Sequence, residues 1–200
     1  MPFISKNTYL SQSEQEDNAL LIFGYFYSRG WSVNAIAGML GNMESESTIN
    51  PGIWESLTTD PEAFKREEER YPGFGLVQWT PYTNYTNWAD SKGYEWTDGI
   101  GQCEWINEQT APAGQWIPTD SYPLSWEEFK ISSESVEYLA SAFLKNFERA
   151  DVEVEPERRS QAKKWYTFLT GSEPPEPPTP STRKRKKYNF LLFKKRRYIV

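Results

Sequence analysis

Apolar residues recur at helical spacing in the first 50 residues and predict two consecutive helices. The first helix is expected to begin after a serine cap at position 11 or 13 and to end before Gly30. Its apolar positions are Leu20, Leu21, Phe23 and Phe26. The second follows a cap at Ser32 and repeats its apolar positions at i, i+3, i+4 and i+7: Ile36, Met39, Leu40 and Met43. Polar residues and the Pro51-Gly52 pair follow, so we expect this helix to end near Glu46.

The middle of the chain has a weaker periodicity. Proline and glycine punctuate residues 50–80, which predicts loops or a small hairpin around a short exposed helix within 62–70. Two further helices are expected at 82–91, ended by Gly93, and at 98–109.

The clearest helical patterns lie between residues 125 and 171. Ser125 and Glu128 have the spacing of a capping box before a short helix. Ser133 is expected to cap a long helix that reaches Phe147, and Pro156 suits the first position of the last helix. Six or seven helices with little strand predict a mainly α domain over residues 1–171.

Two segments of different character follow the predicted domain. Residues 172–182 hold five prolines and no large apolar residue, which is typical of a semi-rigid linker. Residues 183–200 carry nine of the 22 basic residues and none of the 28 acidic ones. Because the rest of the chain is strongly acidic, we expect no specific nucleic-acid recognition by the domain.

Three interpretations of the basic tail at 183–200 stay open. It could be a solvated charge run, or a docking segment that inserts the apolar residues 190–193 into a partner protein. It could also be attracted to anionic polymers or surfaces. Its apolar run is too short to cross a membrane, and so is the run at 19–26. The first 17 residues lack the pattern of a signal peptide, so we expect synthesis in the cytosol and no transmembrane segment.

The composition excludes several kinds of chemistry. The chain has no histidine and a single cysteine, Cys103, so it can form no serine–histidine triad, no histidine-ligated zinc site and no internal disulfide. Acid–base chemistry must therefore use Asp, Glu, Tyr or Lys, and no cofactor is expected. Aromatic residues make up 16% of the chain although its mean hydropathy is −0.75. We expect most of these rings in the core, while some could line a wet groove for sugars or bases.

Two segments concentrate the candidate chemistry. Glu46 lies at the expected C-terminus of the second helix, where the helix dipole disfavours a carboxylate, and a partly buried carboxyl there could serve as a general acid. Taken alone, this segment is better explained by Glu44 and Glu46 as solvated charges at a fraying helix end. In residues 73–81, Gly75 permits a sharp turn, Gln78 offers a donor and an acceptor, and Trp79 offers a flat face. A buried turn with a structural tryptophan is the alternative for this segment.

Together these segments resemble the lysozyme superfamily in its goose-type and lytic transglycosylase branch. The sequences GMLGNMESESTINPGIWE (38–55) and GFGLVQWTP (73–81) resemble most closely the phage tail lysozyme family, with Val77 where the superfamily motif has methionine. Trp31, Tyr85, Trp88 and the segment 147–150 also fit, and the resemblance covers roughly residues 10–170.

The resemblance implies a mainly α, lysozyme-like fold and a wall-degrading enzyme in the virion, at the tail tip of small short-tailed phages. The implied reaction cleaves the β-1,4 bond between N-acetylmuramic acid and N-acetylglucosamine in peptidoglycan during entry. Glu46 matches the catalytic acid and Gln78 matches the glutamine of the groove. The implied partners are peptidoglycan and tail knob proteins, the latter through residues 183–200. In the family's best-known arrangement the linker leads to a zinc endopeptidase domain; with no histidine here, we expect the glycan strand to be the sole target.

The second carboxylate has no sequence signature. Glu55, Asp60 and Glu44 are candidates, and Asp60 is slightly preferred because it precedes Pro61 at a loop turn. Hydrolysis and transglycosylation stay open, since one glutamate can serve as both acid and base when the sugar's own 6-hydroxyl attacks. The expected groove residues are Asn50, Trp54, Gln78, Trp79 and Tyr82. A catalytically idle glycan-binding module, or a structural plug of the tail, is the alternative function.

Overall fold

A computed structural model describes residues 2–108, 114–149 and 155–174. Within these ranges the chain forms eight α-helices: α1 (Gln12–Tyr27), α2 (Val33–Ser47), α3 (Pro61–Glu68), α4 (Thr83–Lys92), α5 (Gly99–Asn107), α6 (Trp126–Ile131), α7 (Val136–Phe143) and α8 (Glu155–Thr170). A 3-10 turn, η1 (Glu55–Leu57), follows α2, and a π-helical turn, η2 (Leu144–Glu148), follows α7. The predicted mainly α class is confirmed.

Of the loops or small hairpin expected in residues 50–80, the described chain forms loops and turns around α3 rather than paired strands. Isolated antiparallel bridges join Phe74 to Trp54 and to Trp79 instead. The predicted linker and tail lie almost wholly outside the described residues, which end at 174.

Local sequence signals fix the ends of most helices. Ser11 and Glu14 form a capping box at α1, and the Ser32 hydroxyl accepts a hydrogen bond of 3.0 Å from the Ala35 amide at α2. The predicted capping box of Ser125 and Glu128 begins α6. Helix α2 ends at Ser47, one residue beyond the expected end at Glu46, where Thr48 adopts a left-handed C-cap conformation.

Helix α2 runs through the core between α7 and α8. Gly38 and Gly41 allow this close approach, because a Cβ atom at Gly38 would lie 2.9 Å from the Ala140 amide nitrogen of α7. A Cβ atom at Gly41 would lie 2.6 Å from the Arg158 carbonyl oxygen of α8. Larger side chains would push these helices apart, and the contacts that α2 makes at its C-terminus would be lost.

The expected helix from Ser133 to Phe147 is wrong in two respects. Ser135, not Ser133, caps α7, and the regular α-helix ends at Phe143 before the π-helical turn η2. Asn146 explains this change of geometry, because its side chain accepts from the Thr119 amide at 3.1 Å and donates to the Tyr122 carbonyl at 2.8 Å. The loop before α6 therefore holds one residue of the helix out of the α register, as in other π-bulges.

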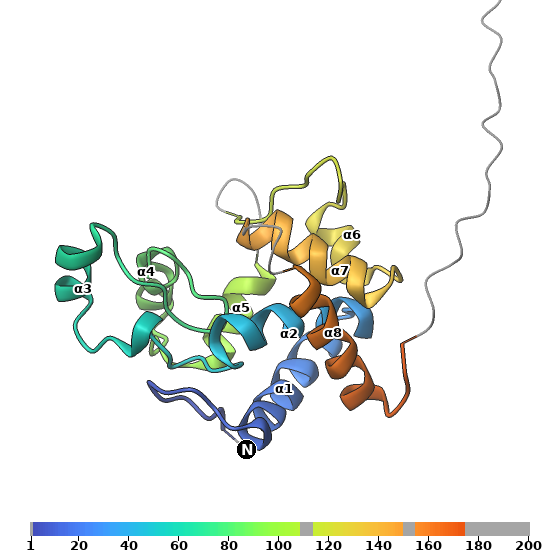
Figure 1. Ribbon diagram of the computed structural model, residues 1–200, viewed down its shortest axis with the longest axis horizontal. Helices are drawn as coiled ribbons and strands as arrows, with labels where there is room; N and C mark the ends of the chain where they lie inside the picture. The colour runs from blue at the N-terminus through green and yellow to red at the C-terminus, as the bar shows by residue number, and fades with distance from the viewer. Residues whose placement is uncertain (1, 109–113, 150–154, 175–200) are drawn as a thin grey trace, which may run out of the picture.

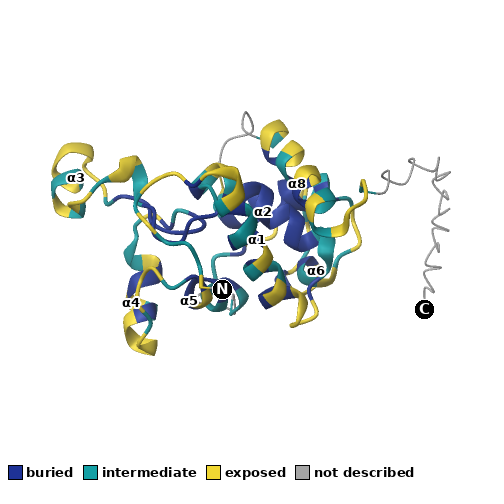
Figure 2. Ribbon diagram, turned by 90° about the horizontal axis from the view of Figure 1, so that it is seen from below, coloured by how far each residue is buried: buried dark blue, intermediate teal, exposed yellow. Residues whose placement is uncertain are grey.

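The elements form two groups that meet at α2 and α5. Figure 1 shows α6, α7 and α8 on one side, while α3 and α4 extend on the other side. Buried residues make up most of α2, whereas α3 is mostly exposed (Figure 2). The C-terminus of α2 lies where the two groups meet.

Candidate active site

Two pockets adjoin at the C-terminal end of α2. One has a volume of about 480 Å³ and contains Glu148, and we call it the Glu148 pocket. The other has a volume of about 450 Å³ and contains Glu55, and we call it the Glu55 pocket. Both are lined by Glu46, Gln78 and Thr80, so they form one groove with Glu46 at its middle.

Glu46 is held in the groove by an arginine from α8. The Arg158 Nη2 atom donates a hydrogen bond of 2.5 Å to Glu46 Oε1, and the side chain of Glu46 is 22% exposed. Arg158 itself is buried, and its Nη1 atom donates a hydrogen bond of 2.6 Å to the Asn42 carbonyl. The last turn of α2 and the first turns of α8 therefore fix Glu46 while leaving part of it open to a ligand.

Glu148, at the end of η2, faces the same arginine from a more buried place. Its side chain is 6% exposed, and its Oε2 atom lies 3.9 Å from Arg158 Nη1. Neither carboxyl oxygen has a hydrogen-bond partner among the described residues. Burial, together with the charge of Glu46, raises the pKa of Glu148 well above its usual range. Glu148 therefore brings to the groove a carboxyl group whose surroundings favour the protonated form.

Glu55, on the opposite side of Glu46, has surroundings that favour the ionised carboxylate. Its two carboxylate oxygens accept hydrogen bonds of 2.5 and 2.8 Å from Arg70, and Oε2 also accepts one of 2.8 Å from the Gly73 amide. The hydrogen bonds from Arg70 lower the pKa of Glu55. Of the acidic residues proposed from sequence beside Glu46, Glu55 is the one that lines the groove.

The structure places the other two acidic candidates outside the groove. Asp60 is the N-cap of α3, where its carboxylate accepts hydrogen bonds of 3.0 Å from the Glu62 and Ala63 amides. Glu44 points toward α8 and accepts from Lys164 Nζ at 2.5 Å and from Trp165 Nε1 at 2.8 Å. Both side chains have structural partners that account for their positions.

Gln78 lies in the groove on a strained turn. Its backbone is in the left-handed region, with φ 48°, and Gly75 before it has φ 80°. The Gln78 side chain donates a hydrogen bond of 3.1 Å to the Gly75 carbonyl, which locks the amide group against the turn. Non-glycine residues in this conformation concentrate at functional sites, in keeping with the position of Gln78 between both pockets.

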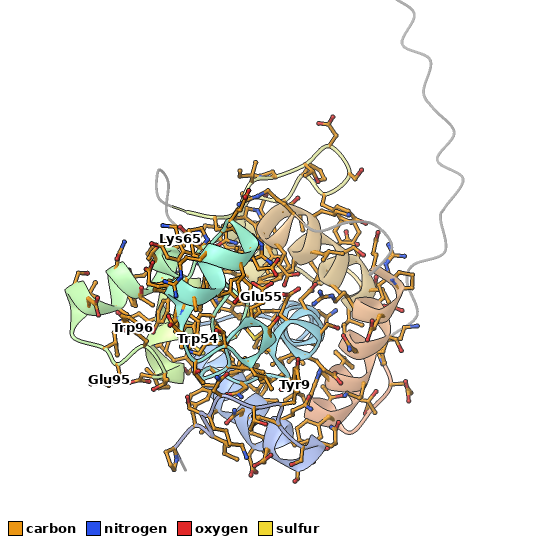
Figure 3. The ribbon with its side chains drawn as sticks, turned by 60° about the vertical axis from the view of Figure 1, so that its left-hand side comes forward. Tyr9, Trp54, Glu55, Lys65, Glu95 and Trp96 are labelled. Atoms are coloured by element: carbon orange, nitrogen blue, oxygen red, sulfur yellow. The ribbon has the colours of Figure 1, made fainter. Side chains whose placement is uncertain are left out.

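The remaining residues expected in the groove divide into one that lines it and three that do not. Trp54 lines the Glu55 pocket, together with Tyr9 of the N-terminal segment (Figure 3). Asn50 is fully buried, and its amide donates to the carbonyls of Lys6 and Thr8, both at 2.6 Å. Trp79 is 1% exposed and stacks on Tyr85 with ring centroids 4.7 Å apart.

Tyr82 is the third residue that does not line either pocket. Its ring packs edge-on against Trp54, with the two centroids 5.1 Å apart. Asn50, Trp79 and Tyr82 therefore support the groove from behind rather than form its surface, because their hydrogen bonds and ring contacts are made within the protein.

Sequence reasoning assigned no role to Glu148 or to Arg158. Segment 147–150 fits the family pattern, but nothing local marks Glu148 as a partner of Glu46. Arg158 carried a usable signal, because with Ala162 and Trp165 it repeats at i, i+4 and i+7 on the buried stripe of α8. An arginine on an apolar stripe indicates a buried acidic partner, since an unpaired buried charge is strongly unfavourable.

The described residues show neither a metal site nor a membrane span. In that part of the chain, no three acidic, cysteine or histidine side chains come together as metal ligands. No helix described here combines the length and the apolar character that a bilayer crossing needs.

Comparisons with known proteins agree with the motifs at Glu46 and Gln78. A sequence model described as phage tail lysozyme matches residues 17–169. The chain is similar to morphogenesis protein 1 of Bacillus phage B103, with 44% identity over 169 residues. These residues cover 84% of this chain and 44% of the relative, so the chain spans less than half of that protein's length.

Proposed function

The chain belongs to the phage tail lysozyme family, and from this premise we propose that it is a peptidoglycan hydrolase of the virion tail. It cleaves the β-1,4 bond between N-acetylmuramic acid and N-acetylglucosamine and so opens the host wall during entry. The proposal includes a lysozyme-like domain of the goose-type and transglycosylase branch at 1–171, a linker at 172–182 and a tail at 183–200.

The position of Glu46 between two adjoining pockets carries this proposal. A glycan strand that lies along the groove passes over Glu46, with sugar units on both sides of it. A carboxyl group at that point can donate a proton to the glycosidic oxygen as the bond breaks. Trp54 offers an aromatic face and Gln78 an amide for the sugar rings and their polar groups.

Glu55 is our candidate for the second carboxylate, in place of Asp60. It is ionised through its hydrogen bonds with Arg70 and lines the pocket on the far side of Glu46 from Glu148. A carboxylate there can stabilise positive charge that develops on the sugar, or activate a water molecule. The Asp60 carboxylate caps the N-terminus of α3 instead.

The test replaces Glu46 by glutamine and measures dye release from labelled bacterial walls. E46Q keeps the shape of the side chain but cannot donate the proton, so wall lysis should fall about 10²–10⁴-fold with an unchanged circular dichroism spectrum. E44Q is the matched control, since Glu44 lies two residues away on the same helix and outside both pockets. Near wild-type lysis by E46Q would refute the assignment and would favour an idle, glycan-binding role for the fold.

A further inference from the structure

Arg158 lies between two glutamates that come from different elements. Its Nη2 atom is 2.5 Å from Glu46 at the end of α2, and its Nη1 atom is 3.9 Å from Glu148 at the end of η2. Nη1 also donates its short hydrogen bond to the Asn42 carbonyl. One guanidinium thus serves two carboxyl groups, and its close contacts go to Glu46 and to the backbone rather than to Glu148.

The charges in this cluster do not balance if both glutamates are ionised. The charged groups facing Glu148 are Glu46 from α2 and Arg158 from α8, and Arg149, the next residue, lines the same pocket. The Arg149 Nη1 atom donates a hydrogen bond of 2.8 Å to the Gln115 carbonyl. Two carboxylates beside Arg158 would leave a buried negative charge without a partner, which is strongly unfavourable. One proton retained on the pair removes that charge.

We propose that Glu148 is a positioning residue that shares one proton with Glu46 and supplies it for donation to the substrate. The inference rests on the proposed function, in which Glu46 is the general acid. It explains how Glu46 can act as an acid although its Oε1 atom is hydrogen-bonded to an arginine, an arrangement that by itself favours the carboxylate.

The proton balance of the reaction closes within the cluster. At rest Glu148 holds the proton, and Glu46 is ionised beside Arg158. The proton passes from the Glu148 carboxyl to Glu46 and then to the glycosidic oxygen, as the bond between that oxygen and the sugar C1 breaks. The attacking hydroxyl, from water or from the sugar's own 6-position, bonds to C1 and loses a proton, which returns to the pair. Arg158 stabilises Glu148 while it is ionised.

The test is the pH dependence of wall lysis by wild type, E148Q and E148D. In E148Q the shared proton is lost, so lysis near neutral pH should fall by about 10²-fold. At acid pH, where protons from solution replace the one that Glu148 supplies, the loss should shrink to about threefold or less. E148D keeps a carboxyl group and should recover most of the activity at neutral pH. E137Q is the matched control, because Glu137 on α7 pairs with Lys163 away from the groove.

The possible outcomes separate this inference from the proposed function. If lysis by E148Q falls by the same factor at every pH, Glu148 has a merely structural role and the inference is overturned. A pH profile of lysis that is the same as that of the wild type also overturns it. An active E46Q would overturn the proposed function instead. If E148Q does not fold, the infrared spectrum of the wild-type protein at neutral pH decides. A protonated carboxyl band supports the shared proton, and its absence refutes it.

Discussion

The two ends of the groove each pair a glutamate with an arginine, yet they leave those glutamates in opposite states. In the Glu55 pocket, Arg70 pairs with Glu55, both side chains are partly exposed, and two hydrogen bonds keep Glu55 ionised. At the Glu148 pocket, Arg158 is buried and faces both Glu46 and Glu148. The pKa of Glu55 is lowered and that of Glu148 is raised. The number of carboxyls per arginine and the depth of burial therefore decide which group holds a proton.

Arg158→Met should have the largest effect on stability. It leaves the partly exposed Glu46 and the buried Glu148 without their cation and deprives the Asn42 carbonyl of its donor. Removing one partner of a buried ion pair typically costs about 3–5 kcal/mol, and urea denaturation near neutral pH measures it. Arg159→Met is the control, since the neighbouring Arg159 side chain is 45% exposed in its pair with Glu155, and pairs of solvent-exposed charges are worth about 0–1 kcal/mol. Equal losses for both variants would mean that the burial of Arg158 has no energetic consequence.

The raised pKa of Glu148 should make stability fall as the pH rises. Above the unfolded-state value, about 4.3, the native state binds one proton more than the unfolded chain. The free energy of unfolding then decreases by about 1.4 kcal/mol per pH unit until Glu148 ionises in the native state. E148Q lacks this proton, so its free energy of unfolding relative to that of the wild type should increase over the same pH range. The free energies of unfolding of the two proteins should differ least near pH 4. Thermal unfolding over a range of pH measures this difference. If the stabilities of the two proteins change with pH in parallel, the raised pKa of Glu148 is contradicted.

Substitutions of Glu55 and of Asp60 should distinguish their roles. E55Q removes the ionised carboxylate of the groove and should lower wall lysis by about 10²-fold if Glu55 takes part in proton transfer. D60N keeps a side chain that can cap α3, whereas D60A should cost about 0.5–2 kcal/mol of stability. Neither Asp60 variant should change the lysis rate of the folded protein. A large loss of lysis in D60N alone would restore Asp60 as the second carboxylate.

Removal of the residues after Ser181 should have the smallest effect on catalysis. The described helices that form the groove end at residue 170, so the truncated protein should lyse walls at the rate of the full chain. We propose that residues 183–200 serve incorporation into the tail. Counting copies of the truncated protein in assembled particles tests this role, and normal incorporation would reject it. A loss of lysis would instead place the tail within the catalytic fold.

The sequence predicted those features that depend on local chemistry. Caps at Ser32 and Ser125 and the stop at Gly93 sit where the pattern indicates, because each is decided within a few residues. The contact between Glu46 and Arg158 spans 112 positions along the chain, and no local pattern encodes it. The π-helical turn that presents Glu148 depends on Asn146 and the distant carbonyl of Tyr122. Asn50 and Trp79 lie inside motifs, but a motif does not reveal which of its side chains face inward.

The most direct test of the proposed function is mass analysis of the fragments released from purified peptidoglycan by the wild-type protein. We expect disaccharide–peptide fragments that end in muramic acid, because the proposed reaction cleaves the bond between N-acetylmuramic acid and N-acetylglucosamine beside Glu46. A reducing end on that sugar indicates hydrolysis, and a 1,6-anhydro end indicates transglycosylation; E46Q should release neither. Intact glycan strands with newly freed peptide ends, or no fragments at all from an active wall preparation, would contradict the assignment.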